Sequence, residues 1–395
     1  MVSNRGRRRS RPETIEETPI KRPPAHGVWI VAVTAMVLGL SAFGFFDPFE
    51  NMSMDFRFAR RGPRPADSRV VLIDIDEQSI KALGLFPWPR ETHARLIERL
   101  VQAGAAAIAF DVLFVDEDTQ NAPGDAALGR AAEESGRTVF GEVFSDFRRD
   151  LPTRLEAPIE AVRGPSVQYG FVNAFPEEDG VLRRSALWLE FEGKKIPSLA
   201  LAALAAARRE FPDKMIRQLS GGFPGRTPLI NFSGWNSGWG GSRSPYHYHS
   251  YADVLQGRLD PGVFNDKIVL VGGTAMGLFD SLTVPNLPVF PGLEIHANIV
   301  DNLLNHSFLW SPPRWGTWGI VFLFQMVLGT WLAGLTTSRG TTIVLGGVVG
   351  YYFLAQLVFN RWSLALDVVA PMATTLANHG TQLFRRLLAY EREIA

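Results

Sequence analysis

The fold is decided by residues 69–114, "RVVLIDIDEQSIKALGLFPWPRETHARLIERLVQAGAAAIAFDVLF". The stretch opens with a short β-branched apolar run, 69–76, and closes with a second apolar run, 105–114. Between them, apolar residues from Ala94 to Val101 recur every three or four positions, which is typical of one helix face, and Gly104 follows as a helix-ending glycine. Strand–helix–strand order with nearly continuous apolar strands predicts a mainly parallel sheet with flanking helices.

The chain beyond this stretch repeats the pattern. Further apolar runs at 137–144 and 266–273 predict buried strands, and helical patterns fill 125–135, 197–211 and 292–305. Residues 166–196 alternate and carry turn signals, so we expect strands and a hairpin there. Residues 229–251 begin like a strand and continue as a Gly/Ser/Trp-rich loop. The fold class predicted is therefore α/β.

Composition excludes several functions. The 395 residues hold 40 Lys and Arg against 40 Asp and Glu, so the formal net charge is zero and no nucleic-acid partner is indicated. The chain has no cysteine, which excludes disulfides, thiolate metal ligands and cysteine nucleophiles. A hydrophobic fraction of 46% with 20% charged residues indicates that part of the chain lies outside water.

Four apolar segments are long enough to cross a bilayer. Residues 27–46 carry no charge, and about 20 such residues span a hydrocarbon core of roughly 30 Å. Three more predicted transmembrane helices, 315–335, 341–360 and 362–382, follow close to the end of the chain. We therefore expect a multi-pass inner-membrane protein whose helices have the lipid bilayer as a partner.

Basic residues set the expected orientation. The tail 1–26 contains seven Lys and Arg residues and is predicted to stay in the cytoplasm, and the stub 383–395 contains three more. Four crossings then place both termini in the cytoplasm and residues 47–313 outside it. Gly346 and Gly350 form a small-xxx-small pair, compatible with a homodimer.

Carboxylates follow the predicted strands where they end. Asp74 and Asp76 are two positions apart on the first strand and share a face, and Asp111 takes the equivalent place on the next. Asp280 follows the apolar run 266–273. Such a cluster at strand ends can hold Mg²⁺ or act as an acid/base pair. The alternative is structural, with aspartates capping the following helices or pairing with Arg90, which we expect to close the cluster.

The histidines have the same two interpretations. His93 and His296 each lie on a helix beside an apolar stripe, where hydrogen-bonded core histidines are common. His247 and His249 lack a third metal ligand at fixed spacing. Residues 271–280, "VGGTAMGLFD", follow a strand but match no phosphate-loop pattern. The sequence thus predicts no catalytic residue, no metal site and no cofactor.

Taken together, these motifs resemble the type-two CHASE domain, the cyclase/histidine kinase-associated sensory extracellular module of bacterial receptors. The stretch 69–114, the segments "DKIVLVGGTAMGLFDSLTVP" and "PGLEIHANIVDNLLNHSFL", and the closing spans carry the resemblance. The matching motif positions are Asp55, Arg57, Asp74, Asp76, Trp88, Arg90, His93, Asp111, Gly272, Asp280, Pro285, Gly292, His296 and Asn298.

The resemblance implies an extracytoplasmic sensory domain that detects an unknown ligand and signals to a cytoplasmic nucleotide cyclase, histidine kinase or Ser/Thr kinase. No such output follows residues 383–395, so we expect it beyond this chain or on a cytoplasmic signalling partner. Two other functions remain open. One is a membrane-tethered, metal-dependent hydrolase that uses the Asp cluster, and the other is a non-sensing envelope assembly protein.

Overall fold

The chain forms two compact units. The computed structural model describes residues 26–119, 121–148, 151–222, 225–234, 244–275 and 281–394. One unit comprises residues 51–311 together with 356–366, and the other comprises the residues up to Glu50 with 312–355 and 367–395. Residues 1–25 of the predicted tail lie outside the described residues, and so does Asp280.

The larger unit, which we call the α/β unit, is built on a seven-stranded sheet in the order β4-β3-β2-β9-β1-β8, with β5 also paired to β3. Every pairing in it is parallel except that of β3 with β4. The prediction of a mainly parallel sheet is confirmed. Its strands are β1 (Val70–Ile75), β2 (Ala107–Leu113), β3 (Thr138–Arg148), β4 (Leu151–Glu156), β5 (Gln168–Phe171), β8 (His247–Ser250) and β9 (Ile268–Gly273).

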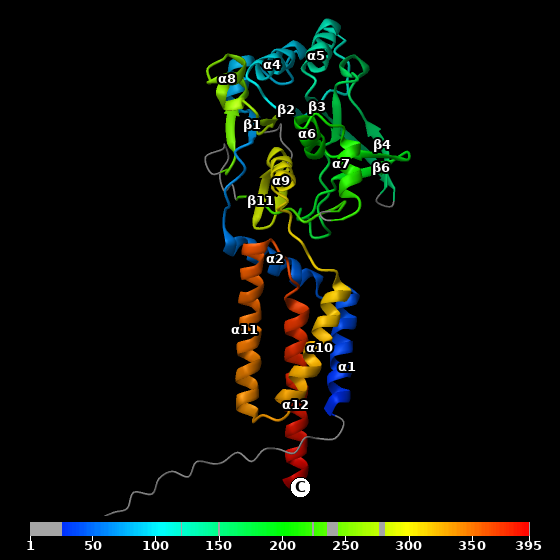
Figure 1. The fold of residues 1–395 in the computed structure, drawn as a ribbon, viewed down its shortest axis with the longest axis vertical. Helices are drawn as coiled ribbons and strands as arrows, with labels where there is room; N and C mark the ends of the chain where they lie inside the picture. The colour runs from blue at the N-terminus through cyan, green and yellow to red at the C-terminus, as the bar shows by residue number, and fades with distance from the viewer. Residues whose placement is uncertain are drawn as a thin grey trace, which may run out of the picture. The chain divides into compact units, whose positions relative to one another are not determined.

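Helices cover both faces of this sheet (Figure 1). Alternate side chains of a strand point to opposite faces. Val71 and Ile73 of β1 pack with α4 (Arg90–Gln102), α5 (Ala122–Ser135) and α8 (Tyr251–Leu255). Val70 and Leu72 pack with α6 (Leu199–Ala207) and α9 (Gly292–Asn305). We call these two sides the α4 face and the α9 face.

Smaller elements complete the unit. They are α2 (Asp47–Arg61), α3 (Glu77–Leu83), α7 (Pro212–Leu219), the 3₁₀ turns Glu160–Val162 and Pro261–Phe264, and two hairpins, β6 (Trp188–Phe191) with β7 (Lys194–Pro197) and β10 (Ser281–Val284) with β11 (Leu287–Pro291). The strands and hairpin expected in 166–196 are present as β5 and β6–β7.

The expectation of a loop in the later part of 229–251 is wrong at its end. β8 (His247–Ser250) pairs in parallel with β1 at the edge of the sheet. Only four residues pair, and their composition, His-Tyr-His-Ser, is too polar to show the apolar run of a buried strand. Residues 235–243 of the same stretch lie outside the described residues.

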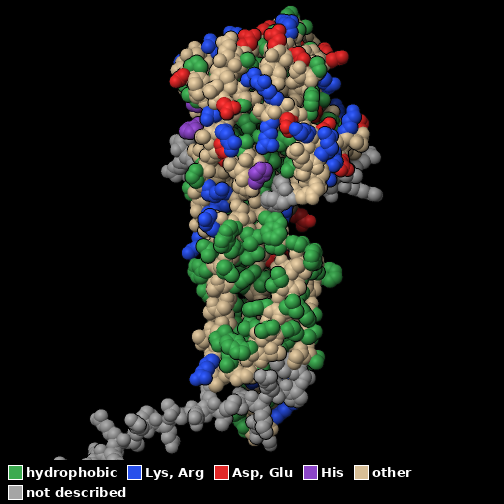
Figure 2. All heavy atoms as spheres, viewed as in Figure 1, with side chains coloured by type: hydrophobic (Ala, Val, Ile, Leu, Met, Phe, Trp, Pro, Cys, Tyr) green, Lys and Arg blue, Asp and Glu red, His purple; other side chains and the backbone are tan. Residues whose placement is uncertain are grey.

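The smaller unit, which we call the helical unit, consists of α1 (His26–Ala42), α10 (Arg314–Leu332), most of α11 (Thr337–Trp362) and α12 (Val369–Ile394). Figure 2 shows a largely hydrophobic surface over these helices. Among the described residues, α10 and α11 are long and apolar enough to cross a membrane, and α1 with α2 makes a third span if the bent pair is counted as one. The expectation of four spans is therefore confirmed only in part.

The predicted fourth span, 362–382, differs most from the structure. Residues 363–368 are not helical, Ser363 has a φ of 53°, and α12 begins only at Val369. The polar side of α12 is buried among the other helices, where Asn378 donates a 2.9 Å hydrogen bond to Thr34 and Gln325 donates one of 2.6 Å to Thr375. These buried amides and hydroxyls are hydrogen-bonded, as buried polar groups are in proteins generally, and they lower the apolar character of α12.

Candidate functional site

Two of the predicted carboxylates lie in one row on the α9 face. Asp74 of β1 is paired in register with Gly272 of β9, and the register of β2 with β9 places Asp111 on the other side of that glycine. A Cβ at Gly272 would lie 3.3 Å from Cβ of Asp111 and 3.0 Å from Leu293 at the start of α9. Glycine at 272 thus lets α9 approach the sheet between the two carboxylates.

Asp74 is buried and held by Thr274. Its side chain is 7% exposed and accepts hydrogen bonds from the backbone N–H of Thr274, at 2.9 Å, and from the Thr274 hydroxyl. Burial raises the pKa of Asp74 to about 7, against the opposing effect of these hydrogen bonds, and the charge of Asp76 adds to the increase. Asp74 therefore changes charge near neutral pH.

Asp76 caps a helix. Its side chain accepts a 2.7 Å hydrogen bond from the backbone N–H of Ser79, as expected of an N-cap residue at the start of α3. It also accepts a 2.9 Å hydrogen bond from the Ser250 hydroxyl at the end of β8. This is the capping role that the sequence offered as an alternative to a binding role.

Arg90 does not close the carboxylate cluster. Its guanidinium lies 3.3 Å from Asp125 of α5, donates a 3.1 Å hydrogen bond to the Asp116 carbonyl and stacks on Phe114. The expectation that Arg90 pairs with Asp74, Asp76 or Asp111 is wrong, because α4 covers the opposite face of the sheet from Asp74 and Asp111. Asp125 was not singled out in the sequence, because only the packing of α5 against α4 brings it to Arg90.

His93 is a core residue of the α4 face. It is fully buried, its Nδ1 lies 2.9 Å from the Tyr251 hydroxyl, and aromatic rings surround it, Trp88 and Phe114 among them. Burial lowers the pKa of His93 to about 3, and the charge of Arg90 lowers it further. His93 is therefore neutral at physiological pH and is separated by the sheet from the other predicted histidine.

That other histidine, His296 of α9, lies beside Asp111. Its Nε2 is 3.9 Å from Asp111 Oδ1, and its Nδ1 is buried with no hydrogen-bond partner among the described residues. Burial lowers the pKa of His296, and the charge of Asp111 opposes that change. The neutral ring can accept or donate one hydrogen bond at each side.

A cavity of about 360 Å³ opens where Asp111 and His296 meet. It lies at the carboxyl ends of β2 and β9, the place where open α/β sheets bind ligands. Asn173, Ser185 and Ser198 add polar groups to its lining, and leucine, isoleucine and valine side chains supply the rest. Sequence analysis did not single out these three residues, because each follows a different element and only the folded sheet brings them together.

The predicted cluster is thus divided. Asp74, Asp111 and His296 lie on the α9 face, Arg90 and His93 belong to the α4 face, and Asp76 caps α3. In the part of the chain that the structure describes, no group of three or more His, Asp or Glu side chains is arranged to hold a metal ion.

This combination of an α/β unit and apolar helices has a known family counterpart. A family model for the CHASE2 domain matches residues 30–335, most of the chain. The chain belongs to the CHASE2 domain family, as the sequence motifs indicated. CHASE2 is an extracellular sensory domain rather than a catalytic one. Comparison with curated proteins and with solved structures finds no match.

Proposed function

We propose that this protein is a multi-pass inner-membrane receptor module that detects an extracytoplasmic signal and passes it to a cytoplasmic output. In this proposal residues 47–313 lie outside the cytoplasm, and both termini lie within it. The output, a nucleotide cyclase, a histidine kinase or a Ser/Thr kinase, is supplied beyond these residues or by a partner chain.

The observation that carries the proposal is the placement of residues 356–366. This segment lies between the main parts of α11 and α12, yet it belongs to the α/β unit. Phe359 and Ala365 are 1% and 2% exposed and are part of the same hydrophobic core as α6 and α9. A sensory domain must act on its membrane helices, and here the connection between two of those helices is packed into the sensory domain.

Specific contacts hold this segment. The Phe359 ring meets Phe58 of α2 edge-on, with centroids 5.1 Å apart. Arg57 is fully buried and donates a 3.0 Å hydrogen bond to the Leu366 carbonyl. Trp310 exchanges 2.8 Å backbone hydrogen bonds with Ser363 and Ala365. A ligand that favours one packing of this segment shifts the equilibrium between conformations by its differential affinity for them.

Contacts inside the helical unit support the orientation. Arg385 of α12 lies over the Trp29 ring of α1, and Arg386 donates a 3.1 Å hydrogen bond to the carbonyl of Ala333, beyond the end of α10. The start of α1 and the end of α12 therefore share one end of the unit. Basic residues gather at that end, as they do on the cytoplasmic side of membrane proteins.

Cysteine labelling tests the orientation cleanly, because the natural chain has no cysteine. Glu134→Cys on α5 and Glu391→Cys on α12 each place one thiol at an exposed position. In cells with a permeabilised outer membrane, a membrane-impermeant maleimide should label the first variant and leave the second unlabelled until the inner membrane is lysed. Labelling of Glu391→Cys in unlysed cells would refute the proposed topology.

A further inference from the structure

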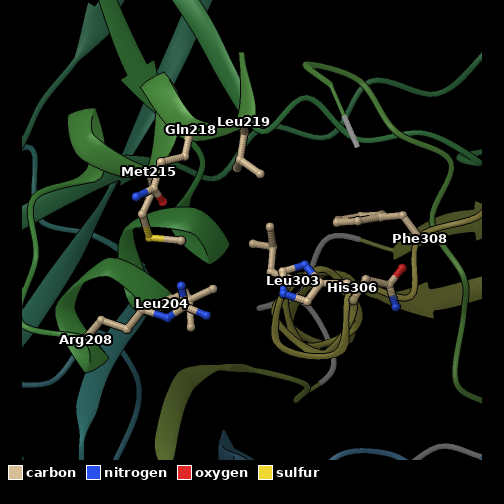
Figure 3. A pocket seen from close by; sticks show the side chains of 9 residues that line it. Leu204, Arg208, Met215, Gln218, Leu219, Leu303, His306 and Phe308 are labelled. Carbon is tan, nitrogen blue, oxygen red and sulfur yellow. The ribbon is translucent and has the colours of Figure 1, made fainter. Parts of the chain in front are cut away.

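A second cavity lies at the other end of α9, away from the strand ends. It has a volume of about 250 Å³ and lies between α6, α7 and the last turn of α9 (Figure 3). Its apolar lining includes Leu204, Met215, Leu303 and Phe308, each at most 5% exposed. An apolar cavity of about 150 Å³ is enough to bind benzene, so this cavity has room for a ring with a short side chain.

The polar groups of this cavity are basic or neutral. Arg208 stands on the α6 side and His306 on the α9 side (Figure 3). The lining contains no carboxylate, and Arg208, an exposed residue at its edge, makes no ion pair among the described residues. A guanidinium presents a rigid fork of N–H donors that matches a carboxylate, and so an apolar cavity with an unpaired arginine at its edge is complementary to an apolar acid.

We infer that this cavity binds a small carboxylic acid with an apolar body, about the size of an aryl-substituted propionate. The apolar body occupies the space between Leu204, Met215 and Leu303. The carboxylate lies at the edge and accepts hydrogen bonds from the Arg208 guanidinium. This site is distinct from the Asp111–His296 cavity, where a carboxylate would meet the negative charge of Asp111.

The cavity is connected to the segment between the membrane helices. Asn302 lines the cavity and exchanges two hydrogen bonds with the backbone of Asn231, of 2.7 and 3.0 Å. The Asn231 side chain in turn donates 2.7 and 3.0 Å hydrogen bonds to the Ser307 carbonyl and the Ser363 hydroxyl. Asn231 and Asn302 are both fully buried. A ligand that orders the end of α9 therefore acts on residue 363 through two side chains.

Binding of the acid and its effect on residues 356–366 can be tested separately. The binding site is inferred from the cavity alone, whereas its role as the sensory site rests on the proposed function. The test uses the full chain in lipid nanodiscs, with 3-phenylpropionate, 3-phenylpropanol and 3-phenylpropylamine as probes and isothermal titration as the readout. We expect the acid to bind at least tenfold more tightly than the alcohol and the amine not to bind.

Three variants assign the binding to this cavity. Arg208→Gln should remove the preference for the acid, so that acid and alcohol bind within threefold of each other. Arg209→Gln, an equal change of charge on the neighbouring exposed residue outside the lining, should leave it intact. Leu219→Trp, which fills the cavity, should abolish binding of both probes. Equal binding of acid and alcohol by the natural chain, or equal effects of Arg208→Gln and Arg209→Gln, would overturn the inference.

Hydrogen exchange separates the site from its consequence. If the acid binds as described and also slows amide exchange in residues 356–366, the site and its role are both supported. If the acid binds with the expected preference and exchange in 356–366 does not change, the site stands and its role in the proposed function fails.

Discussion

The two faces of the sheet are built from the same strands and have opposite chemistry. On the α4 face, His93 and the rings around it form a sealed aromatic core, and the Arg90–Asp125 pair lies at its edge. On the α9 face, Asp74 and Asp111 lie near the ends of the same strands, and Asp111 lines a cavity of about 360 Å³. Both faces bury a hydrophobic core, and the α9 face in addition leaves volume and polar groups for a ligand at the strand ends.

The largest effect on the free energy of unfolding should come from removal of a large core side chain. Phe140→Ala empties a fully buried position on the α4 face and should lower the free energy of unfolding by about 3–5 kcal/mol, since large-to-small changes in a packed core leave a cavity. Leu282→Ala removes a half-buried side chain that already borders a cavity on the α9 face, and should lower it by about 1 kcal/mol. Urea unfolding of the full chain in detergent, followed by tryptophan fluorescence, measures both. Equal losses would show that the side chains bordering the Asp111–His296 cavity are packed as tightly as those of the α4 face.

The ion pair at the edge of the α4 face should have the next largest effect. Asp125 is 3% exposed and accepts hydrogen bonds from Arg90 and from the backbone N–H of Asp118. Asp125→Ala leaves Arg90 without its carboxylate and should lower the free energy of unfolding by about 3 kcal/mol. Glu134→Ala, an exposed carboxylate on the same helix, is the control and should change it by less than about 0.5 kcal/mol. A loss in the control as large as that in Asp125→Ala would show that the loss does not come from the ion pair, because alanine has the higher helix propensity at both positions.

The two faces should respond to pH with opposite signs. The pKa of His93 is lowered to about 3, so below pH 6.5 the unfolded state binds a proton that the folded state does not. The contribution of His93 to stability therefore decreases as the pH is lowered. The pKa of Asp74 is raised to about 7, so the folded state binds the extra proton between about pH 4 and 7, and stability rises as pH falls. Each contribution is about 2 kcal/mol between pH 7 and 5, at about 1.4 kcal/mol per pH unit.

Single variants separate these two contributions. On acidification from pH 7 to pH 5 the two contributions offset each other in the natural chain, so His93→Gln should gain stability relative to it and Asp74→Asn should lose stability relative to it. Thermal unfolding of the full chain at both pH values gives the comparison. The same direction of change in both variants would show that one of the two groups has been assigned the wrong charge.

The sequence predicted the architecture of the α/β unit better than its site. Strand–helix–strand periodicity in 69–114 is local, so the parallel sheet and the covering helices followed from it, and the family was indicated by the resemblance of the motifs. The partner of Arg90 did not, because Asp125 is 35 residues away and meets Arg90 only after α4 and α5 pack on the sheet. Strand alternation correctly placed Asp74 and Asp111 at strand ends. It gave no sign that Asn173 and Ser185 join Asp111, since their positions depend on connections between elements rather than on periodicity.

The smallest effect should come from a contact of residues 356–366 within the α/β unit. Ser363→Ala removes the hydroxyl that accepts the Asn231 hydrogen bond and should lower the free energy of unfolding by only about 1 kcal/mol. Because the lost contact joins the α9 face to residues 356–366, amide exchange in that segment should increase, while exchange in β1 and β2 stays unchanged. Ser338→Ala, at an exposed hydroxyl outside this segment, is the matched control. If Ser363→Ala accelerates exchange throughout the sheet instead, residues 356–366 are part of the structural core and do not respond separately from it.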